Sequence, residues 1–265
     1  MSVVSASLLE KIKDVGRFIL AELNNLGGKD VDLKGKHDLV TRVDRESERR
    51  LIELLSDFSP SQDTGFLTEE FNPEVELSKH EWWWVVDPLD GTTNYVHRIP
   101  VFAISVALMH GSGSVKQGIV YDIYHDFMFY ATEGNGSFLN GKRIYVSRES
   151  NVDNFLIATG FPFSDLSRAE EYLRMFKHLM REVQGLRRMG SAAIDLAYTA
   201  AGKFEGFFEY GLKAWDVAAG SLLVKEAGGS VADFKGQDNY LFGREIIAGS
   251  PSGFDYLRKL CLRYF

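Results

Sequence analysis

A single segment constrains the fold and the chemistry of this chain more than any other part of its sequence. It begins with the apolar run Trp82 to Val86 and continues as Asp87-Pro88-Leu89-Asp90-Gly91-Thr92-Thr93-Asn94. The apolar run predicts a strand, and two acids three residues apart follow it. Pro88 and Gly91 favour a turn in which the two carboxyl groups converge and a helix begins. Cations on the carboxylates and a phosphate group at the helix N-terminus would suit such a turn, which favours phosphate-ester hydrolysis.

Other acids also lie at the ends of predicted elements. Glu69 and Glu70 follow Phe66-Leu67-Thr68, and Asp216 follows Trp215 at the start of a predicted helix. Asp-Pro and Asp-Gly pairs are also common turn residues, so the segment 87–94 taken alone could be purely structural. Several carboxylates held together repel one another unless cations neutralise them. Oxygen ligands without a cysteine set or a histidine pair favour Mg²⁺ over Zn²⁺.

Composition narrows the protein class and the partners. The 265 residues are 45% hydrophobic and 25% charged, which is typical of a folded chain with a sizeable core. The formal net charge of −7 argues against direct nucleic-acid binding and against an anionic membrane as partner. The N-terminal apolar pattern carries charges, unlike a secretory signal, and the single cysteine, Cys261, excludes an internal disulfide. We therefore expect a cytoplasmic protein.

Hydrophobic periodicity predicts a different rhythm in each half of the chain. Two helices, near residues 8–20 and 44–59, are expected to precede any strand, with the polar stretch 29–38 between them. An antiparallel sheet is predicted from four apolar segments, at residues 81–86, 102–109, 115–121 and 126–132. The second half alternates strands with helices, which predicts a mixed sheet; its helices are expected at residues 167–181, 191–201 and 216–227 and at the C-terminus. We expect one layered unit over residues 1–265, with approximate halves 1–150 and 151–265.

Five blocks of sequence resemble the inositol monophosphatase family. This family lies within a superfamily of lithium-sensitive, magnesium-dependent phosphatases that includes fructose-1,6-bisphosphatases. The resemblance spans the chain in the family's order and is carried by Asp38-Leu39-Val40-Thr41-Arg42-Val43-Asp44, Glu69-Glu70, Asp87 to Asn94, Gly190-Ser191-Ala192-Ala193 and Trp215-Asp216-Val217-Ala218-Ala219-Gly220. It implies an α+β fold with layers in the order αβαβα, and a homodimer.

The resemblance also implies a set of metal ligands. Glu69, Asp87 and the backbone carbonyl of Leu89 would hold one Mg²⁺, while Asp87, Asp90 and Asp216 would hold a second. These residues place the metal and phosphate site in the first half, with Asp216 contributed by the second half. The polar stretch 29–38 corresponds to a lid that contributes a further metal.

Catalytic roles are implied for two residues of the first half. Thr92 and Asp44 would orient a metal-activated water and accept its proton, and the backbone N–H groups of Gly91 and Thr92 would hold the phosphate. Asp44 could instead be a simple helix cap.

Substrate contacts are implied for the second half, together with Asp90. The matching positions are Gly190, Ser191, Ala192, Glu209 and Asp216. Ser191 could equally be only the cap of a helix.

The function implied is a Mg²⁺-dependent phosphomonoesterase acting on inositol 1-phosphate or a related polyol or sugar phosphate. A dual enzyme that also hydrolyses fructose 1,6-bisphosphate is an alternative, because Arg168, Arg187 and Arg188 could engage a second phosphate. An alternative of another class is a regulatory protein that binds the transcription machinery, since bacterial relatives include one with that role.

Overall fold

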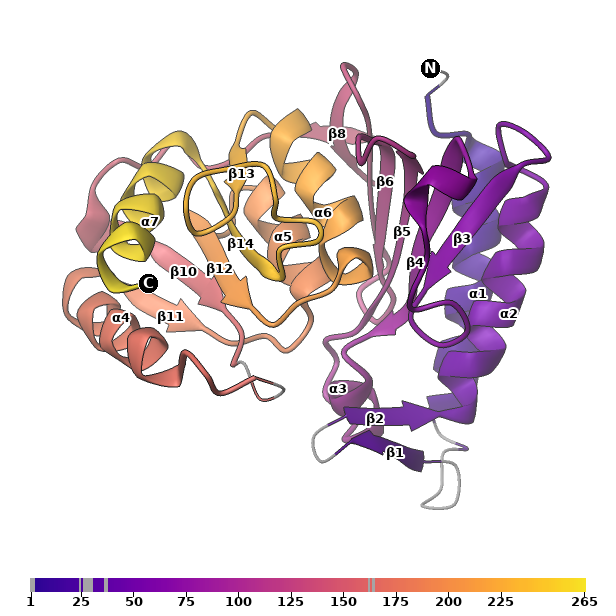
Figure 1. Cartoon of the computed structure of the whole chain (residues 1–265), viewed down its shortest axis with the longest axis horizontal. Coiled ribbons are helices and arrows are strands. Elements are labelled where there is room, and N and C mark those ends of the chain that lie inside the picture. Colours follow the sequence, from indigo (N-terminus) through magenta and orange to yellow (C-terminus); the bar gives the residue numbers. More distant parts are fainter. Residues whose placement is uncertain (1–2, 24, 26–30, 36–37, 162, 164) are drawn as a thin grey trace.

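Five layers make up the protein in the order helices, sheet, helices, sheet, helices (Figure 1). The computed structural model describes residues 3–265 except 24, 26–30, 36–37, 162 and 164, and for residues 31–35 and 38–39 it describes the backbone only. The predicted α+β class and the αβαβα order of layers are both confirmed.

The outer helices of the first half cover one face of a seven-stranded sheet. These helices are α1 (Ala6–Leu23) and α2 (Arg42–Ser56). The strands follow the chain in order as β3 (Thr64–Thr68), β4 (Trp82–Asp90), β5 (Ala103–His110), β6 (Val115–Asp122), β7 (Phe127–Thr132), β8 (Gly136–Leu139) and β9 (Lys142–Ile144). Strands β4 to β9 pair antiparallel, as predicted, whereas β3 and β4 are parallel. The segment between β3 and β4, which contains the short 3₁₀ helix η2 (Leu77–Lys79), makes the crossover that a parallel pair requires.

The prediction that two helices precede any strand is wrong. An antiparallel pair, β1 (Val31–Gly35) and β2 (Asp38–Thr41), lies between α1 and α2. Among the described residues these strands pair only with each other, so their sequence lacks the apolar signal of strands in a core sheet. Residues 29–30 and 36–37 of the predicted lid lie outside the described residues.

The second half contains a mixed five-stranded sheet, as predicted. Its order is β11 (Gly185–Arg187), β10 (Leu156–Thr159), β12 (Gly206–Tyr210), β14 (Glu245–Gly249) and β13 (Ser230–Ala232). Strand β10 is parallel to β11 and β12, and β14 is antiparallel to its two neighbours. Strands β11 and β13 have three residues each, which is too short for a periodic pattern. Helices α4 (Ala169–Glu182) and α7 (Pro251–Tyr264) form the outer layer (Figure 1).

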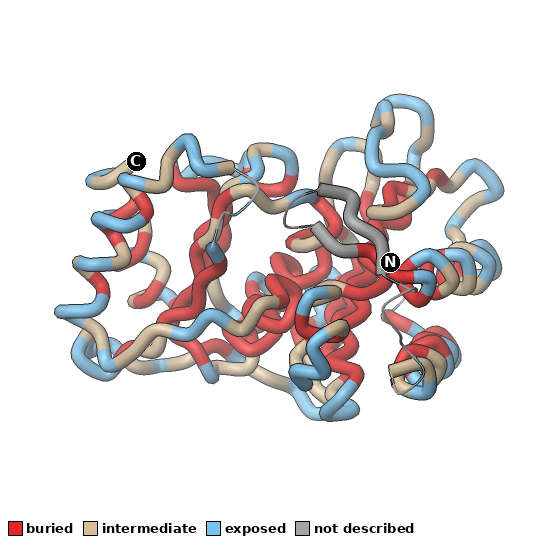
Figure 2. The backbone as a smooth tube through the Cα atoms, turned by 90° about the horizontal axis from the view of Figure 1, so that it is seen from below, coloured by how far each residue is buried: buried red, intermediate tan, exposed pale blue. Residues whose placement is uncertain are grey.

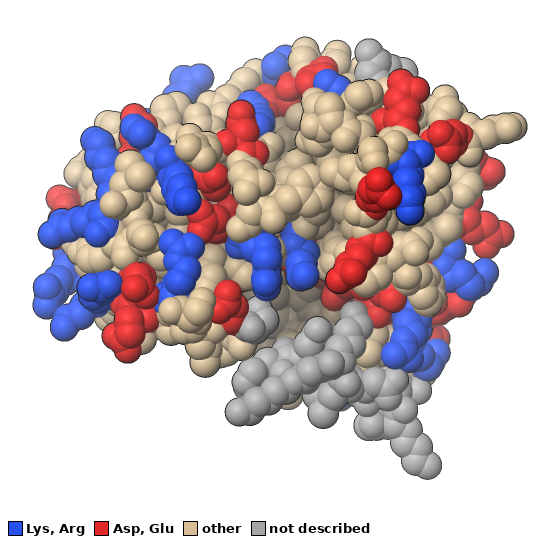
Figure 3. Space-filling model, viewed as in Figure 1, with Lys and Arg blue, Asp and Glu red and all other residues tan. Residues whose placement is uncertain are grey.

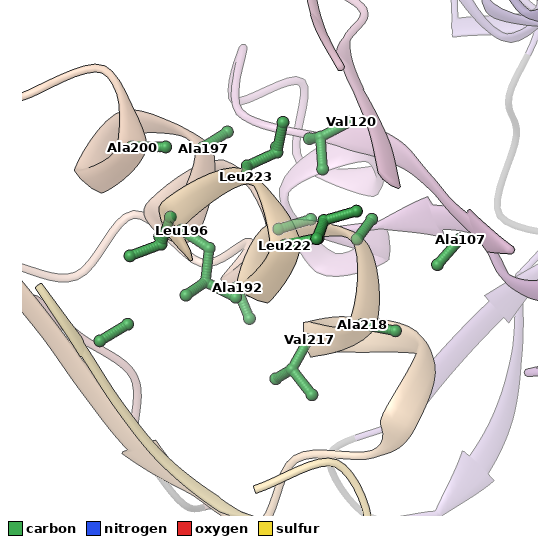
Figure 4. Packing of buried hydrophobic residues seen from close by; sticks show 14 of the residues in the cluster. Ala107, Val120, Ala192, Leu196, Ala197, Ala200, Val217, Ala218, Leu222 and Leu223 are labelled. Atoms are coloured by element: carbon green, nitrogen blue, oxygen red, sulfur yellow. The ribbon is translucent and has the colours of Figure 1, made fainter. Parts of the chain in front are cut away.

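Helices α5 (Ala192–Ala200) and α6 (Ala214–Glu226) form the layer between the two sheets (Figure 1). Both are apolar almost all round, as expected of helices buried on every side, and Figure 2 shows the burial concentrated in this middle region. Their small residues allow close packing: Figure 4 shows Ala192, Leu196 and Ala197 of α5 beside Leu222 and Leu223 of α6. At Gly118 of β6 a Cβ atom would lie 2.7 Å from the Ala219 carbonyl oxygen. The backbone of α6 therefore packs directly against the backbone of β6 at this point.

Within the described residues, we find no helix with the length and apolar character needed to cross a membrane.

Candidate functional site

Strand β4 is longer than the strand predicted at residues 81–86, and it includes both Asp87 and Asp90. It continues past Val86 to Asp90, and its pairing with β5 is irregular between Asp87 and Asp90. Pro88 lies in this irregular stretch and has no N–H group for the sheet. Gly91 then turns the chain with φ of 96°, a conformation that favours glycine, and α3 (Thr92–Val96) begins.

The carboxyl group of Asp87 lies among three other acids. Asp87 is only 2% exposed and accepts a hydrogen bond from the Leu89 N–H at 2.9 Å. Burial raises its pKa well above the usual range, and the charges of Glu69, Asp90 and Asp216 raise it further. Four acids from the ends of three elements therefore repel one another in one place.

Asp90 joins the first half of the chain to the start of α5. Its Oδ2 accepts hydrogen bonds from the Ser191 hydroxyl and from the Ala193 N–H, both at 2.7 Å. Burial raises the pKa of Asp90 to about 6, although these two hydrogen bonds and the charge of Arg188 oppose the shift. Ser191 also caps α5 by accepting a hydrogen bond from the Ile194 N–H. Its hydroxyl group therefore both caps the helix and contacts Asp90.

Asp216 belongs to the first turn of α6. Its Oδ2 accepts from the Lys213 N–H at 2.7 Å, which fixes the carboxyl group at the helix start. Burial raises its pKa, and the charge of Asp90 is the next cause. The Ser105 hydroxyl of β5 donates to the Trp215 carbonyl oxygen at 3.0 Å. This bond ties the residue next to Asp216 to the sheet that carries Asp87.

Thr92 and Asp44 are in contact. The Thr92 hydroxyl lies 2.9 Å from Asp44 Oδ1 and 3.1 Å from the Leu89 carbonyl oxygen. The other oxygen of Asp44 accepts from the Thr41 N–H at 2.8 Å in the capping box of α2. Asp44 is 1% exposed, and burial raises its pKa. It is therefore both a helix cap and the partner of Thr92.

The residues predicted to contact the substrate lie around Asp90. Burial raises the pKa of Glu209 to about 8; the charge of Arg188 opposes the shift and that of Asp90 adds to it. Gly190 precedes the cap of α5 with φ of 92°, and Ala192 is the first residue of that helix. The Asn94 side chain of α3 donates to the Met189 carbonyl oxygen at 2.9 Å. The segment before α5 is thus anchored to the turn after Asp90.

The three arginines differ in their surroundings. Arg168 forms an ion pair with Glu245 and stacks on Phe265, at a cavity that none of the predicted site residues line. Arg187 donates to the carbonyl oxygen of its own neighbour, Leu186. Only Arg188 lowers the pKa of Asp90 and Glu209, so it alone of the three brings positive charge to the acids.

Two functional candidates escaped the sequence analysis. Glu48 is fully buried on α2 and accepts from the Glu70 and Phe71 N–H groups, both at 2.8 Å, so it fixes the backbone next to Glu69. Asp195 on α5 is 1% exposed, and its Oδ1 has no hydrogen-bond partner. Burial raises the pKa of Asp195, and the charges of Glu209 and Asp90 add to the shift. The available signal was spacing: Glu48 lies one turn after Asp44, and Asp195 lies one turn after Ser191.

The donor set fits Mg²⁺ in its chemistry. Its members are carboxylate oxygens and the carbonyl oxygen of Leu89, whose side chain is buried. In the described part of the chain, no three Asp, Glu, His or Cys side chains are drawn together at the spacing of a closed metal centre. The acids around Asp87 are thus close enough to raise its pKa, but they are not arranged as a closed set of metal ligands.

Comparison with known proteins identifies the family. The model of the inositol monophosphatase family matches residues 2–260. The chain belongs to this family. It is therefore a member of a phosphatase family, and the resemblance drawn from the five sequence blocks is confirmed.

Individual family members are similar over nearly the whole chain. Nus factor SuhB of Escherichia coli (strain K12) is 41% identical over 239 residues, which cover 90% of this chain and 88% of the relative. The structure of the extragenic suppressor protein suhB from Bartonella henselae has a TM-score of 0.87 and 38% identity, with 97% of each chain covered. The Thermotoga maritima IMPase has a TM-score of 0.84 and 31% identity, with 97% of this chain and 95% of the other covered.

We predict that the metal-free protein loses stability as the pH rises from about 4 to about 8. The folded state holds protons on Asp90 and Glu209 up to about pH 6 and about pH 8, whereas the unfolded chain releases them near their ordinary pKa values. Their contribution is therefore complete below the unfolded pKa and disappears as the pH passes the folded pKa. Thermal unfolding in EDTA across this range measures the effect.

Two controls sharpen this experiment. Glu209→Gln should make the loss of stability smaller, because it removes one of the groups whose pKa burial raises. The other buried acids, Asp87, Asp195 and Asp216, should still give a decline with rising pH. Mg²⁺ should raise the melting temperature more at the alkaline end, where its ligands are deprotonated. A metal-free protein that becomes more stable with rising pH would contradict the assignment.

Proposed function

We propose that this chain is a Mg²⁺-dependent phosphomonoesterase that hydrolyses inositol 1-phosphate or a related polyol or sugar phosphate. We also propose that residues 1–265 act as a single catalytic unit within a homodimer. The observation that carries the activity is the buried Asp87 carboxyl group, which lies in the field of Glu69, Asp90 and Asp216. Membership of the inositol monophosphatase family supports the substrate class.

The proposed ligands of Mg²⁺ are the four acids and one backbone carbonyl group. They are Glu69, Asp87, the Leu89 carbonyl oxygen, Asp90 and Asp216. When bound, Mg²⁺ would neutralise the acids, polarise the phosphate group and make a bound water more acidic. Glu48 would act indirectly, because its two hydrogen bonds hold the backbone that presents Glu69.

Thr92 and Asp44 provide a route for the proton of the attacking water. The Thr92 hydroxyl has one hydrogen, and when it donates this hydrogen to Asp44 its lone pairs can accept from water. Thr92 can then take a proton from the water as it gives its own to Asp44. Burial makes the Asp44 carboxylate a stronger base than a solvent-exposed Asp.

Backbone and acidic groups would hold the two ends of the substrate. Gly91 caps α3 and Thr92 is its first residue, and N–H groups at these positions have no acceptor inside their helix. They are proposed to bind phosphate oxygens. Asp90, Asp216, Glu209 and the segment Gly190 to Ala192 are proposed to accept from or donate to the hydroxyl groups of the polyol.

We predict that Asp90→Asn lowers kcat at least about 100-fold while the protein stays folded. Both hydrogen bonds to Asp90 end on one oxygen, which an Asn side chain can keep while the charge is removed. Steady-state phosphate release and thermal unfolding measure the two effects. Asp153→Asn, at an exposed position, is the matched control and should leave kcat unchanged. Near-normal turnover of Asp90→Asn would refute the role of this acid.

Thr92→Ala should lower kcat by about 100-fold or more and change KM by less than about threefold, because it removes a proton-transfer group. Thr93→Ala, at the next and exposed position of α3, should behave like the wild type. Initial rates over a range of substrate concentrations separate the two constants. A change confined to KM would be inconsistent with a role in chemistry.

A panel of phosphate esters tests the proposed substrate class. Phosphate release from inositol 1-phosphate, fructose 1,6-bisphosphate and a 3′-phosphorylated nucleotide is compared with and without Mg²⁺. We expect Mg²⁺-dependent hydrolysis with inositol 1-phosphate preferred. A preference for the bisphosphate would favour the dual enzyme, for which Arg188 is the available cation near the acids. Absence of activity on every ester would refute the proposed function.

A second candidate function is binding to the transcription machinery. It is supported by the relatives named Nus factor SuhB and by exposed cations on the outer helices, where Figure 3 shows basic side chains gathered over the side of α4 and α7. These cations are Arg174, Lys177, Arg181, Lys259 and Arg263. The negative net charge of the whole chain was the reason to expect no nucleic-acid contact, whereas these cations give this one face local positive charge. Binding to purified RNA polymerase that survives Asp90→Asn but is lost when the α4 cations are replaced by alanine would support this role.

A further inference from the structure

Gly160 lies where a side chain would collide with Glu209. A Cβ atom built at Gly160 would lie 2.0 Å from Glu209 Oε1 and 2.1 Å from both Cδ and Oε2 of the same carboxyl group. The φ angle of Gly160 is outside the left-handed region, so an alanine could adopt this backbone conformation. Glycine is therefore required here for space and not for its conformational freedom.

The register of two parallel strands explains this proximity. Strand β10 pairs with β12 through Thr159 and Phe208, and Gly160 and Glu209 are the residues that follow each of them. Side chains at neighbouring positions of paired strands point to the same face of the sheet. The Glu209 side chain thus folds across the Cα atom of Gly160, in the place of the side chain that this residue lacks.

The backbone at Gly160 is anchored on both sides. The Thr159 hydroxyl lies 2.8 Å from the Phe208 carbonyl oxygen and 3.0 Å from the Tyr172 hydroxyl. The Phe161 ring packs edge-on against the ring of Tyr172. A methyl group added at Gly160 would consequently displace the Glu209 carboxyl group more readily than the backbone.

The surroundings of Glu209 make such a displacement consequential. The charges of Arg188 and Asp90 act on the Glu209 carboxyl group. The charge of Glu209 in turn raises the pKa of Asp195. The Oδ1 atom of Asp195 is buried and has no hydrogen-bond partner among the described residues, so this atom does not hold the Glu209 carboxyl group in place. The absence of a side chain at Gly160 leaves the space in which the Glu209 carboxyl group lies.

We propose that Gly160 is a specificity-determining position. Because it has no side chain, the Glu209 carboxyl group can lie over its Cα atom, and in this place Glu209 recognises hydroxyl groups of the substrate. This proposal rests on the phosphatase function proposed above. Gly160 is a positioning residue that acts through Glu209. It should influence the recognition of the alcohol part of the substrate and leave the chemistry at phosphorus intact.

A stability cycle tests the contact without using activity. Gly160→Ala should lower the melting temperature in the wild-type background and lower it much less in a Glu209→Ala background, where the carboxyl group is gone. Gly185→Ala, on the other neighbour of β10, is the matched control, because the nearest atoms to its Cβ are side-chain atoms at 3.3 Å. An equal loss in both backgrounds would overturn the proposed contact.

An activity cycle tests recognition with two substrates. Inositol 1-phosphate carries hydroxyl groups, whereas 4-nitrophenyl phosphate carries none. Gly160→Ala should raise KM for inositol 1-phosphate about tenfold, the size expected for one lost hydrogen bond, and keep kcat/KM for the aryl phosphate within about twofold. In a Glu209→Ala background, where the group that meets the added methyl group is gone, the same substitution should have little further effect.

The outcomes separate the two proposals. Equal losses on both substrates, or full additivity with Glu209→Ala, would overturn the role of Gly160 while the phosphatase function stands. A wild-type protein that hydrolyses neither substrate would overturn the phosphatase function and with it the recognition role, and the stability cycle would still decide whether the contact exists.

Discussion

The mutual repulsion of buried carboxyl groups is the constraint on which the rest of the site depends. Asp87 is almost without solvent contact, and three other acids add their negative charge to its surroundings. Such a set destabilises a folded chain unless protons or cations compensate it. Hydrogen bonds offset part of the cost at Asp90 and Asp216, but those at Asp90 use one carboxylate oxygen only. The arrangement is therefore understandable as a site for a divalent cation, whose binding would reverse the sign of these interactions.

The layered architecture is what brings these acids together. Helix α6 lies between the two sheets and presents Asp216 at its first turn, while β4 presents Asp87 and Asp90. Close packing at Gly118 and the bond from Ser105 to the Trp215 carbonyl group fix the helix on the first sheet. Ser191, the N-cap of helix α5, donates a hydrogen bond directly to Asp90. The two halves of the chain thus share one site through their common middle layer.

Much of this could be predicted from the sequence, and the limits have physical causes. The apolar run before Asp87 and the Gly190 and Trp215 blocks contain local signals, namely a strand end, a capped helix and small residues in a helix start. The pair β1 and β2 has no such signal, because among the described residues these strands pair with each other and not with either larger sheet. Glu48, Asp195 and Gly160 matter through contacts with residues distant in the chain, such as the pairing of β10 with β12. Periodicity along one segment contains no information about such contacts.

The most direct measurement is a crystal structure of the protein grown at about pH 8 with Mn²⁺, which takes the same oxygen ligands as Mg²⁺ and is located by its anomalous scattering. We expect anomalous peaks bridged by Asp87 and coordinated at about 2 Å by oxygens of Glu69, Leu89, Asp90 and Asp216. A map without a peak among these acids, with their carboxyl groups turned to protein cations instead, would contradict the proposal that the site exists to bind a metal.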